Sequence, residues 1–74
     1  MAGFRHEPKT KEFFGGYEPE AYFGYGYMIE VVDYYGATKY RIFRVWSDGY
    51  IDDTEVAWYA NLKEAKNWCK ANAR

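Results

Sequence analysis

The sequence predicts a small α+β fold in which a three-stranded antiparallel sheet has one C-terminal helix packed on one face. Two observations lead to this fold class. Between residues 27 and 59, runs of aromatic and β-branched residues are separated by short glycine-containing segments, which is typical of strands joined in a meander. From residue 61 to 73, apolar residues recur at helical spacing. We expect one domain spanning residues 1–74, since a chain of 74 residues has room for one such core.

The three strands are expected over residues 27–34, 39–46 and 50–59. Gly36 lies between the first two strands and supplies the permissive backbone that a tight turn needs. Asp48 and Gly49 lie between the second and third strands, and an Asp-Gly pair flanked by apolar runs is a strong hairpin signal. Connections this short join antiparallel neighbours, so the order along the chain is also the expected order in the sheet.

The helix is expected over residues 61–73, with Asn61 as its N-cap and Glu64 three residues later in a box-like arrangement. The side of the helix that contains Leu62, Trp68 and Cys69 is predicted to pack on the sheet. A stripe on another side is basic and is expected to face solvent. It consists of Lys63, Lys66, Lys70 and Arg74.

Residues 1–26 show no clean period and are expected to form an irregular, aromatic N-terminal arm. Residues 21–27 are either an irregular lead-in to the first strand or an aromatic loop, because glycines weaken an otherwise strand-like run. The arm is too apolar for a simple tail. Two interpretations are considered, an arm that folds back over the sheet and a mobile arm that becomes ordered on a partner. We favour the first. Its apolar residues are Phe4, Phe13, Phe14 and Tyr17.

Both faces of the predicted sheet contain apolar residues. In the second strand, Tyr40, Ile42 and Trp46 point to one face, whereas Phe43 and Val45 point to the other. One helix covers one face, so the other face needs a cover of its own. We expect this cover to be the arm first, a second copy of the chain next, and a partner surface third.

Charge and cysteine content restrict the function classes. Ten basic residues balance eleven acidic ones, for a net charge of −1, whereas proteins dedicated to duplex DNA usually have a positive excess. The one cysteine, Cys69, cannot form an intramolecular disulfide and fits a reducing cytoplasm. The first ten residues lack the apolar run of a signal peptide, and no stretch has the length of a membrane span. We expect a cytoplasmic protein that does not bind membranes.

The sequence offers no catalytic constellation, and we predict that the protein is not an enzyme. His6 lies near the terminus, where a solvated side chain is expected, and Cys69 lies on the core side of the helix. No histidine can be assigned to activate the cysteine. The glycines at 24 and 26 lack the third glycine of a dinucleotide-binding fingerprint, and the carboxylates of residues 48–55 do not match a calcium loop. We therefore expect no cofactor and no metal.

Two groups of residues are candidates for contact with a partner. The first is aromatic, and its acidic flanks favour a protein over nucleic acid, because stacking sites for bases have basic flanks. The second surrounds the Asp-Gly turn and is acidic. It is interpreted either as a charged edge that discourages pairing between sheets or as a surface that meets a basic groove. The two groups are Tyr22, Phe23, Tyr25 and Tyr27, and Asp48, Asp52, Asp53 and Glu55.

Two resemblances to known families add to this interpretation. Residues 39–72 read as strand, Asp-Gly turn, strand and a helix that begins Asn-Leu-Lys-Glu-Ala, which resembles part of the arm-binding domains of phage-type integrases. That resemblance implies DNA binding through a three-stranded sheet, although those sheets are basic and this third strand contains Asp52, Asp53 and Glu55. In size, aromatic content, charge and plan, the whole chain resembles the small proteins that phages encode against host defences, including anti-CRISPR proteins.

We predict a non-enzymatic protein-binding module. The second resemblance implies a phage-encoded inhibitor that blocks a host defence protein or nucleoprotein complex by steric occlusion, in the cytoplasm of the host cell. The alternative is a nucleic-acid-binding accessory domain that uses the sheet, with direct nucleic-acid binding the less favoured of the two. A self-assembling subunit, such as a homodimer, stays open as a third class.

Overall fold

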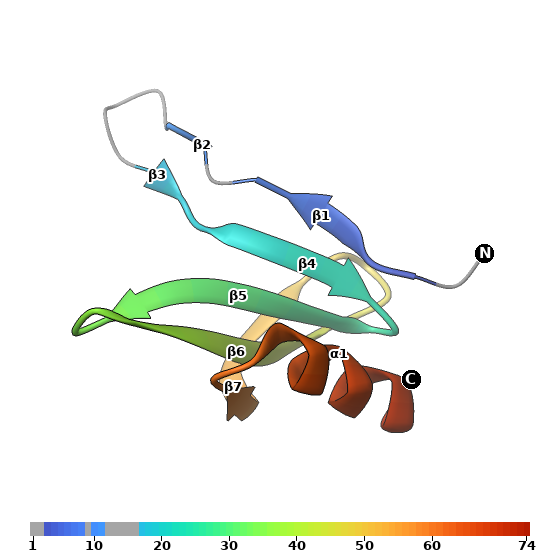
Figure 1. The fold of residues 1–74 in the computed structure, drawn as a ribbon. Helices are drawn as coiled ribbons and strands as arrows, with labels where there is room; N and C mark the ends of the chain where they lie inside the picture. Colours follow the sequence, from blue (N-terminus) through green and yellow to red (C-terminus); the bar gives the residue numbers. More distant parts are fainter. Residues whose placement is uncertain (1–2, 9, 12–16) are drawn as a thin grey trace.

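The computed structural model describes residues 3–8, 10–11 and 17–74. It shows a five-stranded antiparallel sheet in the order β1-β4-β5-β6-β7, with one helix on one face (Figure 1). A two-stranded ribbon of β2 and β3 lies beyond one end of β1 and β4. The elements are β1 (Arg5–Glu7), β2 (Thr10–Lys11), β3 (Tyr17–Glu18), β4 (Glu20–Gly24), β5 (Tyr27–Tyr34), β6 (Ala37–Val45), β7 (Ile51–Tyr59) and α1 (Leu62–Ala71).

The antiparallel sheet and the C-terminal helix are confirmed, but the prediction of three strands is wrong. The two additional strands, β1 and β4, lie within the segment predicted to be an irregular arm. β4 pairs with β5 through a two-residue turn in which Tyr25 and Gly26 have φ values of 56° and 85°. Tyr35 and Gly36 repeat this geometry between β5 and β6, with φ values of 50° and 84°. Positive φ at both central residues defines the type I′ turn, which matches the twist of paired strands. Gly26 therefore makes a hairpin rather than interrupting a strand.

The beginning of the arm extends the sheet instead of crossing it. β1 pairs with β4, placing His6 opposite Tyr22. Phe4 packs against Tyr25 on the helix side, with ring centroids 5.2 Å apart, and Lys66 Nζ of α1 lies 5.5 Å from its ring. The prediction that the arm covers the second face is therefore wrong for the residues described in this part of the chain. Residues 13 and 14, which contributed to that prediction, lie outside the described residues.

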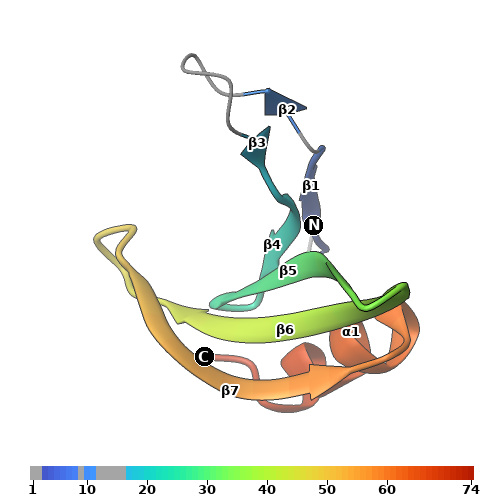
Figure 2. The ribbon, with the colours of Figure 1, turned by 90° about the vertical axis from the view of Figure 1, so that its left-hand side faces the viewer.

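β7 is the outer strand on the other side, and it is strongly curved (Figure 2). The register explains the curvature. Ile51 faces Val45 and Glu55 faces Phe43, so β7 advances four residues where β6 advances two. Extra residues on one strand form bulges, which bend it and increase its twist. The side chain of Asp52 stabilises the bulged part of β7, because its Oδ1 accepts a hydrogen bond of 2.9 Å from the backbone N–H of Thr54.

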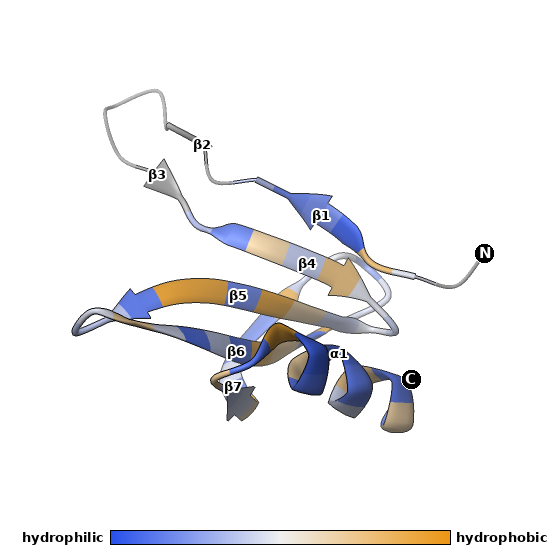
Figure 3. Cartoon of the chain, viewed as in Figure 1, coloured by the Kyte–Doolittle hydropathy of each residue, from blue (hydrophilic) through white to orange (hydrophobic). Residues whose placement is uncertain are grey.

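The core lies between α1 and the middle strands. Its buried members are Tyr27, Ile29, Ile42, Ala65 and Cys69. Leu62 and Trp68 pack around them, as the helical spacing predicted. Asn61 is the N-cap, and its Oδ1 accepts hydrogen bonds from the N–H groups of Lys63 at 2.8 Å and Glu64 at 3.2 Å. β5 has two hydrophobic bands separated by a hydrophilic one (Figure 3), and the register places Met28 and Ile29 on opposite faces of the sheet.

The C-terminal end is tied to the turn between β4 and β5. Tyr27 Oη donates a hydrogen bond of 2.7 Å to the carbonyl of Asn72. The backbone N–H of Arg74 donates to the carbonyl of Tyr25 at 3.2 Å, and its guanidinium lies 4.3 Å from the Trp46 ring. These contacts join residues that are up to 49 positions apart in the sequence. They hold the segment that follows α1 against the sheet.

We expect Tyr27→Phe to lower the free energy of unfolding by about 1 kcal/mol, because it removes one buried hydrogen bond and leaves the ring in place. The measurement is urea denaturation followed by tryptophan fluorescence. Tyr50→Phe is the matched control, since Tyr50 is exposed in the hairpin, and its effect should be smaller than about 0.5 kcal/mol. Equal stability of the two variants would show that the Tyr27–Asn72 hydrogen bond does not support the fold.

Candidate binding face

The sheet has one face covered by α1 and one face that points away from it. Cross-strand pairs assign residues to the two faces, because paired residues project to the same side. Ile29 pairs with Ile42 on the helix side, whereas Met28 pairs with Phe43 on the other side. We call this second side the open face. Its main residues are Arg5, Glu7, Ala21, Phe23, Met28, Glu30, Val32, Tyr34, Lys39, Arg41, Phe43, Glu55 and Trp58.

Cations lie over aromatic rings along the open face. The Arg5 guanidinium lies 4.8 Å from the Phe23 ring, and the Arg41 guanidinium lies 5.0 Å from the Phe43 ring. Lys39 Nζ lies 4.6 Å from the ring of Trp58 and 5.4 Å from that of Tyr34. Long basic side chains can cover apolar surface with their stems while their charged ends reach water. This arrangement lets a face with many hydrophobic residues meet solvent without a second layer.

Arg41 stands at the centre of the open face and connects three strands. Its Nε donates to Glu55 Oε1 on β7 at 2.7 Å, and its Nη1 lies 3.6 Å from Glu30 Oε1 on β5. The guanidinium is half-exposed, so each ion pair contributes little to stability. Two carboxylates nevertheless restrict the orientation of one side chain, and this gives the middle of the face a defined shape.

The open face is hollowed on both sides of Arg41. Towards β1 and β4, a hollow of about 370 Å³ is lined by Phe23, Met28 and Ile51, and it adjoins a second of about 320 Å³ that reaches Phe43. Towards the turn between β5 and β6, a third hollow of about 410 Å³ includes Tyr34. The curvature of β7 brings Ile51 close enough to line the same hollow as β4 residues. The face is therefore concave and not flat.

Two large aromatic side chains of the open face are strongly exposed. Trp58 is 52% exposed and Tyr34 is 58% exposed. They lie on β7 and β5, with Lys39 of β6 between them. Tryptophan and tyrosine are common anchors of protein interfaces because they bring large contact areas together with a polar group. These two residues, together with Lys39 and Arg41, were not among the partner-binding residues predicted from the sequence. The alternation that placed Phe43 and Val45 on a second apolar face was the signal that leads to them.

The predicted aromatic group does not form one patch. Tyr27 is buried in the core, and Tyr25 is half-buried in the turn. Tyr22 lies on the helix side, stacked on His6 with centroids 4.5 Å apart, and Phe23 lies on the open face beneath Arg5. Burial and the nearby carboxylate of Glu20 raise the pKa of Tyr22 above its usual value.

The predicted acidic group also divides. Asp48 Oδ1 accepts from the N–H of Tyr50 at 3.0 Å and shapes the hairpin turn. The hydrogen bond from the N–H of Thr54 lowers the pKa of Asp52. Glu55 binds Arg41, and Asp53 lines the hollow that contains Met28 and Phe43. These carboxylates thus lie at the turn, at the bulge and on the open face.

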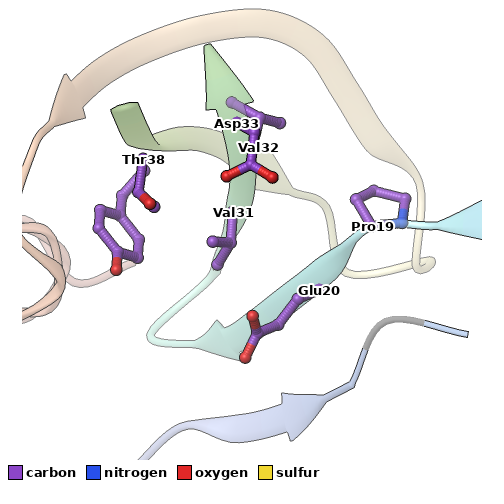
Figure 4. Close-up of a pocket in the computed structure, with 7 residues that line it drawn as sticks. Pro19, Glu20, Val31, Val32, Asp33 and Thr38 are labelled. Carbon is purple, nitrogen blue, oxygen red and sulfur yellow. The ribbon is translucent and has the colours of Figure 1, made fainter. Parts of the chain in front are cut away.

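A further hollow of about 470 Å³ lies between the start of β4 and the hairpin of β5 and β6 (Figure 4). Glu20 and Tyr40 line it together with Val31. The carboxylate of Glu20 is already engaged, because His6 Nε2 donates to Glu20 Oε2 at 2.6 Å and Tyr22 Oη donates to the same oxygen at 3.4 Å. We therefore place the candidate site on the open face, where exposed anchors and hollows coincide.

The two side chains considered for catalysis have structural surroundings. His6 stacks on Tyr22 and binds Glu20, as described above. Cys69 is fully buried in the core, and burial raises the pKa of its thiol to about 12. Within the described ranges, no three side chains of His, Cys, Asp or Glu gather in a way that would hold a metal ion. The ten-residue helix α1 is too short and too polar to cross a bilayer, and no other helix occurs in the part that is described.

Comparison of the chain with protein-family models, with curated proteins and with solved structures finds no match.

Cys69 is expected to resist alkylation in the folded protein, because the thiolate is the reactive form and both burial and the raised pKa suppress it. At pH 8, labelling by iodoacetamide should be more than about 100-fold slower in buffer than in concentrated urea, as followed by intact-mass spectrometry. Rapid labelling in buffer would contradict the burial of Cys69 and would reopen its role as a nucleophile.

Proposed function

We propose that this chain is a non-enzymatic binding module that docks on a larger protein through its open face and occludes the surface beneath. The observation that supports this proposal most directly is the pairing of two exposed aromatic anchors, Trp58 and Tyr34, with hollows on the same concave face. The strands β1, β4, β5 and β6 supply residues to the three hollows of this face, and β7 adds Ile51, Asp52, Asp53 and Glu55 to them.

The composition of the face favours a protein partner. Its residues include aromatics, a methionine and arginine, which are enriched in interface cores. Arg41 is held by Glu30 and Glu55, so its position is set before a partner arrives. A preorganised side chain loses less conformational entropy on binding than a free one. The open face therefore combines residue types that contribute strongly to binding with a restricted geometry.

The setting that we propose is inhibition of a host defence complex by a phage-encoded protein. The support for it is the resemblance in size, composition and charge to small phage proteins of this kind. Steric occlusion needs a rigid surface and no reacting group, and the open face is suited to that role. A homodimer stays a prediction that solution measurements must test.

A nucleic-acid-binding domain is the second candidate, and one observation favours it. Lys39 lies over both Trp58 and Tyr34, and cations beside exposed rings on a sheet are also found where single strands stack. Against it, Glu30 and Glu55 neutralise the adjacent Arg41, and further carboxylates line the face. A single-stranded oligonucleotide that quenched the tryptophan fluorescence of the wild type with strong salt dependence, but not that of Trp58→Phe, would establish this alternative.

The first test compares variants in affinity capture from a host lysate and in phage plating on a host with an active CRISPR system. We expect Trp58→Ala to weaken capture and protection together by about 30-fold, because loss of an interface anchor costs about 2 kcal/mol or more. Lys63→Ala on α1 is the control and should behave like the wild type. Unchanged binding by Trp58→Ala, with folding verified by circular dichroism, would show that the exposed aromatic pair does not anchor the partner.

The second test distinguishes occlusion from catalysis. A module that acts by occlusion should inhibit in proportion to its amount and reach full effect near one chain per target. An enzyme would act at far lower ratios, because each molecule turns over many times. Titration of the purified chain against the captured target gives this ratio directly. Complete inhibition at about one-hundredth of an equivalent would contradict the proposal.

A further inference from the structure

We propose that the half of the open face next to β4 receives a basic amphipathic segment of the partner protein, in which a large apolar side chain is flanked by lysine or arginine. This inference rests on the proposed function and adds the chemistry of the partner. It concerns the two adjoining hollows between β4 and the start of β7, and not the exposed aromatic pair at the other end of the face.

The floor of these hollows is apolar. Phe23 and Met28 come from neighbouring strands, and Ile51 reaches them because β7 bends. Met28 and Ile51 line both hollows, which makes them parts of one groove. Ile51 is 37% exposed although it lies beside other hydrophobic groups, so an apolar side chain from a partner would bury further surface there. The floor accordingly calls for one large aliphatic or aromatic group.

The rim of the groove is acidic. The charged residues that line it are four carboxylates and two guanidiniums, which gives a net charge of −2. Both guanidiniums already have carboxylate partners: Arg5 Nε lies 2.9 Å from Glu7 Oε2, and Arg41 binds Glu30 and Glu55. The two other carboxylates of the rim belong to Asp52 and Asp53. Charge complementarity therefore favours an occupant with cationic side chains on both sides of its apolar group.

The negative charge of the rim also argues against two other occupants, a second copy of the chain and nucleic acid. In a twofold dimer the same patch would meet itself, so acidic rims would face each other and repel. Nucleic acid would bring phosphates towards Asp52 and Asp53. A basic segment is the occupant for which both the floor and the rim of the groove are favourable.

The inference is tested with the intact chain and three fluorescein-labelled peptides of twelve residues. The first has a central Leu-Trp pair between lysines and arginines. The second replaces the pair with alanines, and the third replaces every basic residue with glutamate. We expect the first peptide to bind at least about tenfold more tightly than either of the others by fluorescence anisotropy. Amide shifts in nuclear magnetic resonance spectra should then map to Phe23, Met28 and Ile51. Equal binding of the three peptides, or shifts confined to other surfaces, would overturn the inference.

A charge reversal in the groove supplies the matched control. Asp53→Lys should weaken the first peptide by about tenfold, whereas Glu64→Lys, an exposed change of the same kind on α1, should leave its affinity unchanged. If both variants bind as the wild type does, the acidic rim has no part in recognition. The peptide comparison uses the wild-type chain and stays decisive if a variant fails to fold.

Capture of the partner by two variants distinguishes a failure of this inference from a failure of the proposed function. Loss of the partner with Trp58→Ala but full retention with Asp53→Lys would keep the open face as a binding site and exclude a basic segment as its occupant. Retention with both variants would exclude the open face itself. Tighter binding of an oligonucleotide, or self-association that protects Ile51, would assign the groove to a different occupant and overturn the inference.

Discussion

The packing of one ten-residue helix on one face of a five-stranded sheet is the constraint on which the other features depend. The helix buries Ile29 and Ile42 against Ala65 and Cys69, and this side contains the core. Among the residues that the structure describes, no second layer covers the opposite side, so that side must tolerate water. Most buried residues thus lie on the helix side of the sheet, and the open face adds only Ala21 and Phe43 to them among the described residues.

The open face tolerates water through its basic residues and not through the absence of apolar ones. Arg5, Lys39 and Arg41 each lie over a ring, and carboxylates hold both arginines. These basic side chains form a layer over the aromatic rings, and each contact between a cation and a ring or a carboxylate contributes little free energy at an exposed position. Sequence alternation had indicated a second apolar face, but it could not show that neighbouring cations would cover it.

The sequence indicated the fold of residues 27–74 more clearly than that of residues 1–26, because the patterns in the later segment depend on neighbouring residues. The strand over Tyr27–Tyr34 was predicted with its observed bounds, and Asn61 was predicted as the N-cap, because alternation and capping depend on nearby residues. β4 was missed because Gly26 suggested an interruption, and its role depends on a positive φ that the sequence does not display. β1 has three residues and exposed side chains, so its place in the sheet depends on pairing with β4. The site residues depend on β7 bulges that bring Ile51 across the face, which no local pattern encodes.

Curvature joins the fold to the proposed function. Without the bulges of β7, Ile51 and Asp53 would continue in the plane of the sheet, away from Phe23 and Met28. The bulges also disturb the outer edge of a strand that would otherwise offer nine residues for pairing with another sheet. The carboxylate of Asp52 stabilises the bulge by accepting from the N–H of Thr54. The same acidic stretch therefore shapes the edge of β7 and, in the function that we propose, forms part of the rim of the groove that receives the partner.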